Sequence, residues 1–270
     1  MRIPQFVAMS AVAVALATTA PAAEAQFAYQ PGTHRYRLEQ VTEATQEMGG
    51  QSMSSTMTTT QVIGVQLERA GDSLAVTFTV DSVGIESEIP QAQAMAQAEA
   101  DKLVGAKVKG SVSPRGAIGA LSRVGGDSSS AGDLSAGFRN FFPRFPQGEL
   151  KAGMTWTDTT TSKFDANGID GTAISVVTYT VTGDTTVSGK QAWRIAQKGT
   201  VTTNGTGNSQ GQDLALAGSG TIEGANVVSK DGLYLGGESR LDQNMTVQVV
   251  AMGIEVPVTQ KVTSKVRMVE

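Results

Sequence analysis

Cysteine is absent from the 270-residue sequence, and histidine occurs once, as His34. Disulfide and thiol chemistry are therefore excluded, and a zinc site, which normally uses His or Cys ligands, is not expected. His34 would also have to serve as the base of any Ser/His/Asp triad. The Gly-x-Ser-x-Gly match at 207–211 lies in a Gly/Asn/Ser/Thr-rich region and not between a strand and a helix, so it does not indicate a nucleophile elbow. We predict a protein that is not an enzyme and has no catalytic residues, no metal and no cofactor.

Basic runs are also missing. The chain has 21 Lys and Arg against 25 Asp and Glu, a formal net charge of −4. A mildly acidic chain without a basic patch is a poor binder of nucleic acid, so no nucleic-acid partner is expected. Carboxylates near 86–101, such as Glu86 and Glu99, could in principle form a glycosidase pair. Acidic side chains at helix ends are common, so a hydrolase is the weakest alternative.

Long apolar runs are confined to the N-terminus. Arg2 precedes an apolar segment at 6–19, and Ala23-Glu24-Ala25 has the pattern of a signal-peptidase site. We predict a signal peptide over 1–25 and a mature chain that is periplasmic or extracellular. No cysteine follows to carry a lipid anchor, and no later stretch approaches the ~18 apolar residues of a transmembrane helix.

The rest of the composition is rich in Thr, Val, Ser and Gly, which favours strands joined by tight turns. Leu74, Val76 and Phe78 show the period of two of a half-buried antiparallel strand. Strands are predicted at 33–47, 53–67, 74–80, 107–112, 117–121, 153–164, 172–182, 192–199, 214–228, 233–250 and 256–268, with a bulge between Val176 and Val177. The region 201–212 is interpreted as a loop or as a ragged hairpin tip.

One helix is predicted at 91–104, directly after Pro90, a residue favoured in the first helical turn. It is expected to pack on the sheet; the alternative is a lid over a ligand cavity. The predicted fold class is mainly β: a large curved antiparallel sheet, as a half-barrel or a closed barrel, with one or two short helices.

Turn signals recur in the same order in both halves. Gly32 matches Gly153 at an offset of 121, and Gly49-Gly50 matches Asn167-Gly168 at an offset of 118. This spacing indicates an internal duplication, although evenly spaced hairpins in any β protein could also produce it. The predicted organisation is a first repeat at 26–137, an aromatic linker at 138–152 and a second repeat at 153–270.

The linker holds half of the eight Phe residues: Phe138, Phe141, Phe142 and Phe145. Their spacing fits one face of a short helix over 134–142 that Pro143 would end. The first interpretation is a plug that buries these rings under the sheet. The second is the wall of an apolar pocket, in which the four Phe residues and Trp156 bind the ligand and Arg139 and Arg144 flank the mouth.

The run 142–146 (FPRFP) followed by 150–156 (LKAGMTW) resembles a motif of a bacterial domain-of-unknown-function family of exported two-repeat β proteins. That family has no assigned activity, so the resemblance implies fold and export only. A large curved sheet with a helix is also similar to lipoprotein-carrier half-barrels, which hold acyl chains in their concavity.

Two functions follow as expectations. The first is non-catalytic binding of a lipid or another apolar small molecule in the concave sheet. The second is a structural or protein-interaction module of the cell envelope, whose partner would be another envelope protein.

Overall fold

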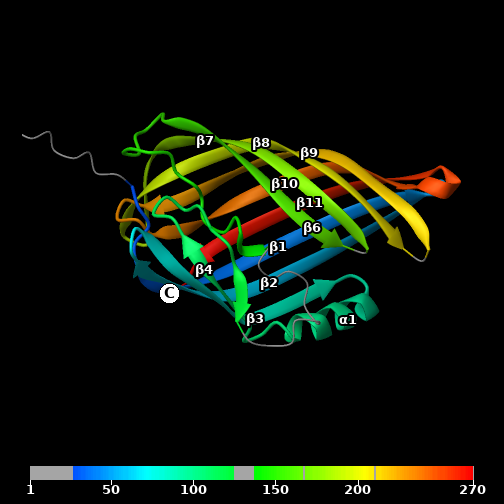
Figure 1. The fold of residues 1–270 in the computed structure, drawn as a ribbon, viewed down its shortest axis with the longest axis horizontal. Helices are drawn as coiled ribbons and strands as arrows, with labels where there is room; N and C mark the ends of the chain where they lie inside the picture. Colours follow the sequence, from blue (N-terminus) through cyan, green and yellow to red (C-terminus); the bar gives the residue numbers. More distant parts are fainter. Residues whose placement is uncertain (1–26, 125–136, 167, 210, 270) are drawn as a thin grey trace, which may run out of the picture.

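The computed structural model describes residues 27–124, 137–166, 168–209 and 211–269. The predicted signal peptide lies outside these residues. The described chain forms one antiparallel sheet of 11 strands with a single α-helix and one 3-10 turn (Figure 1). The elements are β1 (Gly32–Met48), β2 (Gln51–Ala70), β3 (Ser73–Ser87), α1 (Pro90–Asp101), β4 (Lys107–Val112), β5 (Ser122–Val124), β6 (Thr155–Ala166), β7 (Ile169–Val187), β8 (Lys190–Ser209), β9 (Gln212–Ser229), β10 (Tyr234–Val249), η1 (Val250–Met252) and β11 (Ile254–Met268).

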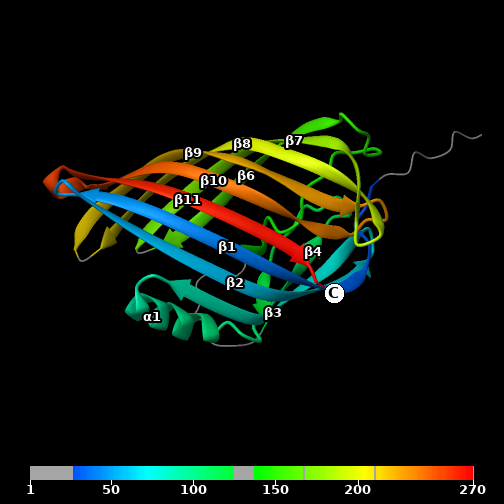
Figure 2. The ribbon, with the colours of Figure 1, turned by 180° about the vertical axis from the view of Figure 1, so that it is seen from behind.

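The strand order is β5-β4-β3-β2-β1-β11-β10-β9-β8-β7-β6. The first and last strands therefore pair in the middle of the sheet, in a ladder that runs from Tyr36 opposite Met268 to Gln46 opposite Val258. β5 and β6 are the two edges and do not pair with each other, so the sheet is open. Both views show it strongly curved (Figures 1 and 2). The predicted fold class is confirmed in its open, half-barrel form.

In both halves, successive strands follow one another across the sheet in the same direction. Read from the β6 edge, the order is β6 to β11 and then β1 to β5. Two copies placed side by side would give this order, and the duplication itself stays a prediction from the sequence. The linker region connects β5 to β6, which are the two opposite edges of the sheet. It passes across the concave side (Figure 1).

The predicted bulge is misplaced. Val176 and Val177 both pair in continuous register with β8, whereas the register shifts between Val181 and Gly183. Gly183 has φ +146, a conformation that L side chains rarely adopt, so the irregularity falls where glycine permits it. The two adjacent valines simply face opposite sides: Val177 is buried and Val176 is exposed on the outer face.

One further segment differs from expectation, and for another the structure decides between two stated alternatives. The predicted strand 117–121 contributes only an isolated bridge between Ile118 and Val112, and β5 begins at Ser122. Gly116 has φ +91 and turns the chain next to Pro143 and Tyr29. The pairing with β4 therefore does not extend into a full strand. The region 201–212 is a hairpin tip, because β8 continues to Ser209 and pairs there with Gln212 of β9.

Helix α1 lies along an open edge of β3. β4 pairs only with 74–79, which leaves the later part of β3 without a strand neighbour on that side. Gln97 fills this place: its Oε1 accepts from the Ile85 amide at 2.7 Å, and its Nε2 donates to the Val83 carbonyl at 3.1 Å. The helix thus packs on the sheet through its edge, which protects the edge from other strands.

Glycines on the inner face of β9 allow the sheet to bend. A Cβ at Gly220 would lie 2.5 Å from the carbonyl oxygen of Asp242, and one at Gly218 would lie 2.5 Å from Cγ of Met245. In the space left free, Gln243 of β10 reaches across β9 and donates to Thr203 of β8 at 2.7 Å. The close approach of β10 to β9 therefore requires residues without side chains here.

We expect Gly220→Ala to lower the free energy of unfolding by ~1–3 kcal/mol, because the new methyl group overpacks against backbone that cannot easily move. Chemical denaturation measures this change. The matched control is Gly84→Ala in β3, where a Cβ would meet nothing within 4 Å, and we expect a change below ~1 kcal/mol. Equal effects at both positions would contradict the close-approach argument.

Candidate functional site

The rings of the linker are buried against the concave side of the sheet. Phe138 stacks on Phe78 of β3 with ring centroids 4.5 Å apart and planes 2° from parallel. Phe141 meets Tyr36 of β1 edge to face at 5.1 Å. Phe142 and Phe145 are also buried. The interpretation as a plug is therefore confirmed, and we call residues 137–154 the plug.

Hydrogen bonds hold the plug in place. The Tyr29 hydroxyl donates to the carbonyl of Pro143 at 3.0 Å, and Nε1 of Trp156 donates to the carbonyl of Arg144 at 2.9 Å. The Phe145 amide donates to the carbonyl of Arg115 at 2.9 Å. These bonds come from the N-terminal segment, from β6 and from the turn after β4, so the plug is attached to both halves of the chain. The predicted helix 134–142 lies partly outside the described residues; within them, Phe141 donates to the carbonyl of Phe138 in a turn.

Tyrosines join the two halves beside the plug. Tyr36 of β1 stacks on Tyr234 of β10 and donates its hydroxyl proton to the carbonyl of Tyr234 at 2.9 Å. Burial raises the pKa of both phenols well above the ordinary value, because the tyrosinate would lose its hydration. Burial likewise raises the pKa of Tyr29 and Tyr179.

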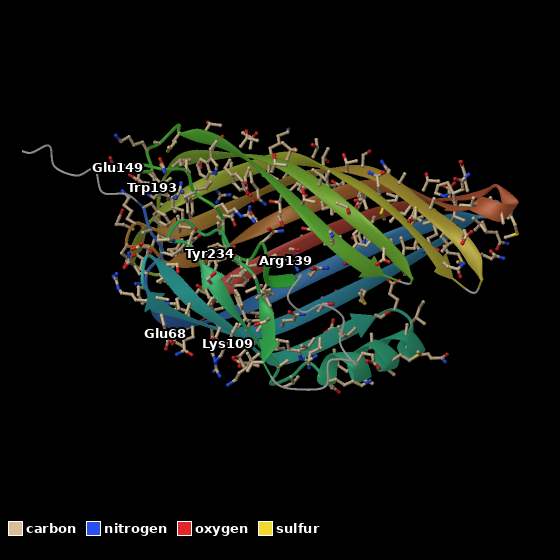
Figure 3. All side chains as sticks on the ribbon, in the orientation of Figure 1. Glu68, Lys109, Arg139, Glu149, Trp193 and Tyr234 are labelled. Atoms are coloured by element: carbon tan, nitrogen blue, oxygen red, sulfur yellow. The ribbon has the colours of Figure 1, made fainter. Side chains whose placement is uncertain are left out.

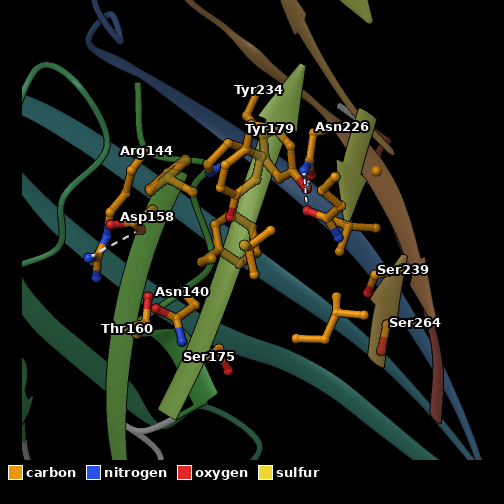
Figure 4. A pocket seen from close by; sticks show the side chains of 18 of the residues that line it. Asn140, Arg144, Asp158, Thr160, Ser175, Tyr179, Asn226, Tyr234, Ser239 and Ser264 are labelled. Carbon is orange, nitrogen blue, oxygen red and sulfur yellow. Dashed lines mark hydrogen bonds and ion pairs between the residues drawn. The ribbon is translucent and has the colours of Figure 1, made fainter. Parts of the chain in front are cut away.

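Between the plug and the sheet lies a cavity of about 350 Å³ (Figure 4). Its walls come from Phe141 and Phe142 of the plug and from the inner faces of β1, β6, β7, β8, β9, β10 and β11. Figure 4 shows side chains of β6 and β7 facing those of the central strands across this space.

Polar groups occupy one side of the cavity. Arg144 of the plug pairs with Asp158 of β6, with Nη1 3.5 Å from Oδ2. Asn140, Thr160 and Ser175 lie next to this pair (Figure 4). The pKa of Tyr179, which also lines the cavity, is raised first by burial and then by the Asp158 charge, and Arg144 opposes this effect.

A second polar group is tied into a network. Asn226 of β9 donates to Oε1 of Gln197 at 2.9 Å and accepts from the Tyr234 hydroxyl at 3.2 Å. Its amide is therefore oriented by bonds on both sides, which fixes the polarity of this wall. The remaining lining is apolar and consists of Leu38, Val177, Ile222 and Val266 together with the plug rings.

The predicted ligand-binding residues divide into two groups. Phe141 and Phe142 line the cavity. Phe138, Phe145 and Trp156 are not among its lining residues: Phe138 packs on Phe78, and Phe145 packs between Phe27 and Trp156. Whether any of the five contacts a ligand stays a prediction.

Sequence reasoning missed most of the polar lining, although it placed Arg144 at a pocket mouth. The sequence predicts no site role for Asp158, Gln197 or Asn226. A usable signal existed: Asp158 and Thr160 are polar residues on the face of β6 that also carries Trp156, and inner positions of a half-buried strand are normally apolar.

The described residues contain no group of three or more His, Cys, Asp or Glu side chains that could hold a metal ion. None of the described helices combines the length and the apolar character that crossing a membrane demands.

No protein-family profile matches this chain. A search of curated proteins finds no match either. Among solved structures, DynF from the dynemicin biosynthesis pathway of Micromonospora chersina is 9% identical, with 91% of this chain and 85% of that chain covered and a TM-score of 0.23. A DUF1329 family protein from Desulfovibrio piger is 11% identical, with 88% and 86% covered and a TM-score of 0.19. At these TM-scores neither structure carries an argument about this chain.

The four tyrosines are all the tyrosines of the chain. Because folding raises their pKa values, the folded state keeps protons that the unfolded state loses above pH ~10, and stability falls as the pH rises beyond this value. We expect tyrosinate absorbance to appear only together with alkaline unfolding. In urea the same groups should titrate near pH ~10. Ionisation near this pH with the fold intact would contradict the burial of the phenols.

The plug should be essential for stability. We expect the double variant Phe141→Ser, Phe142→Ser to lose more than ~5 kcal/mol of unfolding free energy, because two buried rings are removed and polar groups are introduced. Thermal melting by circular dichroism measures the loss. The control is Ile174→Ser, Val176→Ser on the outer face of β7, where both side chains are about 40% exposed or more. An unchanged melting temperature in the plug variant would indicate an exposed binding surface instead.

Proposed function

We propose that this protein is exported and binds a lipidic or other apolar ligand on its concave face without catalysing a reaction. The observation that supports the proposal is the cavity of about 350 Å³ between the plug and the sheet. Small-molecule sites are typically of ~300–1,000 Å³, largely apolar and provided with a few oriented polar groups. The cavity has a volume in this range, an apolar part formed by the plug rings and Leu38, and oriented polar groups at Asn226 and Gln197.

The charges at the cavity restrict the ligand. Three charged residues line it: Arg144, Asp158 and Glu238, whose side chain is exposed on the outer face. Arg144 and Asp158 neutralise each other, and Glu238 lies 3.8 Å from Arg194. A ligand with a net charge would find no uncompensated partner there, and burying its charge would be costly. The ligand we propose is therefore an amphipathic molecule with an uncharged polar end.

The open β6 edge supports a second function, that of a protein-interaction module. β6 is 12 residues long and pairs only with β7. Most of the side chains on its outer face are Thr. A free edge of this length can accept a strand from another protein by β-augmentation. The partner in this alternative is another envelope protein.

Native mass spectrometry distinguishes the two functions. The full chain would be expressed with its N-terminal segment in a bacterium and purified from the envelope fraction without detergent. We expect a mass corresponding to cleavage after Ala25 plus an adduct with the mass of one lipid. A clean apo mass would contradict ligand binding and leave the interaction module as the better function.

A cavity-filling variant locates the ligand. Ser264 of β11 lines the cavity, and its neighbour Thr263 points to the outer face and is exposed. We expect Ser264→Phe to abolish the lipid adduct, because the added ring occupies the space, while Thr263→Phe keeps it. Both variants should melt within a few degrees of the unmodified protein. Retention of the adduct in a folded Ser264→Phe variant would place the ligand elsewhere.

A further inference from the structure

Apolar side chains are exposed where the hairpins at one end of the sheet turn. The turn between β1 and β2 (residues 48–53) and the turn between β10 and β11 (residues 249–254) lie at this end in both views (Figures 1 and 2). We call these two turns the distal tips. They contain four of the twelve most exposed large apolar side chains of the described chain: Met53, Val250, Met252 and Ile254. Met252 is 54% exposed and sits on the 3-10 turn η1.

The distal tips are almost free of charge. No charged residue occurs from 48 to 67, and the stretch 243–260 contains only Glu255. At the other end of the sheet the turns carry Glu68, Arg69, Asp72, Lys230 and Asp231. Figure 3 shows Glu68 and Glu149 at that charged end, away from the tips. The two distal tips themselves are uncharged and apolar, whereas the neighbouring β6–β7 and β8–β9 turns at the same end carry Asp170 and Asp213.

The inner face of the sheet leads from the cavity to the tips. Ser239 of β10 lines the cavity, and alternate residues along the strand share its face. Those residues end in Met245, Val247 and Val249, directly before η1. On β11 the same alternation runs from Ser264 to Ile254. The part of this face next to the tips is apolar, and we call its residues the apolar strip: Met245, Val247, Val249, Ile254, Val256 and Val258. Gln243 and Gln260 lie between the strip and the cavity.

A lipid bilayer fits the tips better than a protein does. A stable protein interface needs ~20–30 residues on each side with matching shape, whereas the tips offer four apolar side chains on two narrow turns. A bilayer needs no such match, because apolar side chains enter the boundary between headgroups and acyl chains individually. Glu255 and Glu47, the nearest charges, are acidic, so they favour an uncharged surface over an anionic one.

We propose that the distal tips insert into the surface of a bilayer of uncharged or zwitterionic lipids, with Met252 and Val250 at the point of insertion. The inference rests on the proposed function in one respect: docking at this end would bring the apolar strip of β10 and β11 to the membrane, where a lipidic ligand could enter or leave.

Flotation with vesicles tests the proposal. The full, processed protein is mixed with phosphatidylcholine vesicles and separated on a density gradient. We expect it to float with the vesicles equally at low and high salt, because the contact is apolar. The double variant Val250→Asp, Met252→Asp should reduce the floating fraction at least about tenfold, because two apolar anchors become charges. Adding an anionic lipid should not increase binding.

The matched control is Val269→Asp. Val269 is 52% exposed, close to the value for Met252, but it follows β11 at the opposite end of the sheet. This variant should float like the unmodified protein, and all variants should show the same melting temperature. Flotation that the tip variant leaves unchanged, or that requires anionic lipid, would overturn the proposal. A dimer in sedimentation that the tip variant abolishes, without vesicle binding, would assign the tips to a second copy and also overturn it.

Native mass spectrometry of the tip variant separates this inference from the proposed function. A lipid adduct without flotation of the unmodified protein means that the cavity binds a ligand and the tips do not dock. Flotation without any adduct means that the tips dock and the proposed ligand function fails.

Discussion

An open, curved sheet must cover its apolar concave face, and in this protein the contact between the plug and that face is the interaction on which the remaining structure depends. Phe141 packs against Tyr36 of β1 and Tyr234 of β10, while Phe138 stacks on Phe78 of β3. These strands belong to both halves of the chain. The plug therefore supplements the β1–β11 ladder, which is the only strand pairing between the halves among the described residues. Removing water from these rings stabilises the contact between the two halves.

The cavity is the part of the concave face that the plug leaves unfilled. It lies between the plug rings and the inner faces of the central strands and of β6 to β9. The plug supplies Arg144 and the rings, and the strands supply Asp158, Asn226 and the apolar floor. Binding surface and packing surface are thus continuous, which is why Phe141 and Phe142 belong to the core and to the cavity wall at once.

Much of the fold was predictable because the period of two is a local property. Alternation at 74–80 identifies a strand, Pro90 begins the helix, and β4 has the expected bounds. What was missed depends on features that a period of two does not encode. The bulge falls at Gly183 because backbone conformation, and not two adjacent valines, decides where register shifts. The role of Gln97 could not be foreseen, because only the strand order shows that β3 has an open edge beside the helix.

The sequence by itself determined the class of fold: strands almost throughout, a helix after Pro90 and an aromatic-rich linker, in a chain with no cysteine and one histidine. Only the tertiary structure decided which strands pair, that the sheet stays open, and which polar residues meet across the concave face. Asn226 and Gln197 lie 29 residues apart, and Tyr36 and Tyr234 lie 198 apart. Such contacts depend on long-range register, which alternation leaves undetermined because it specifies the face of a side chain and not its neighbour.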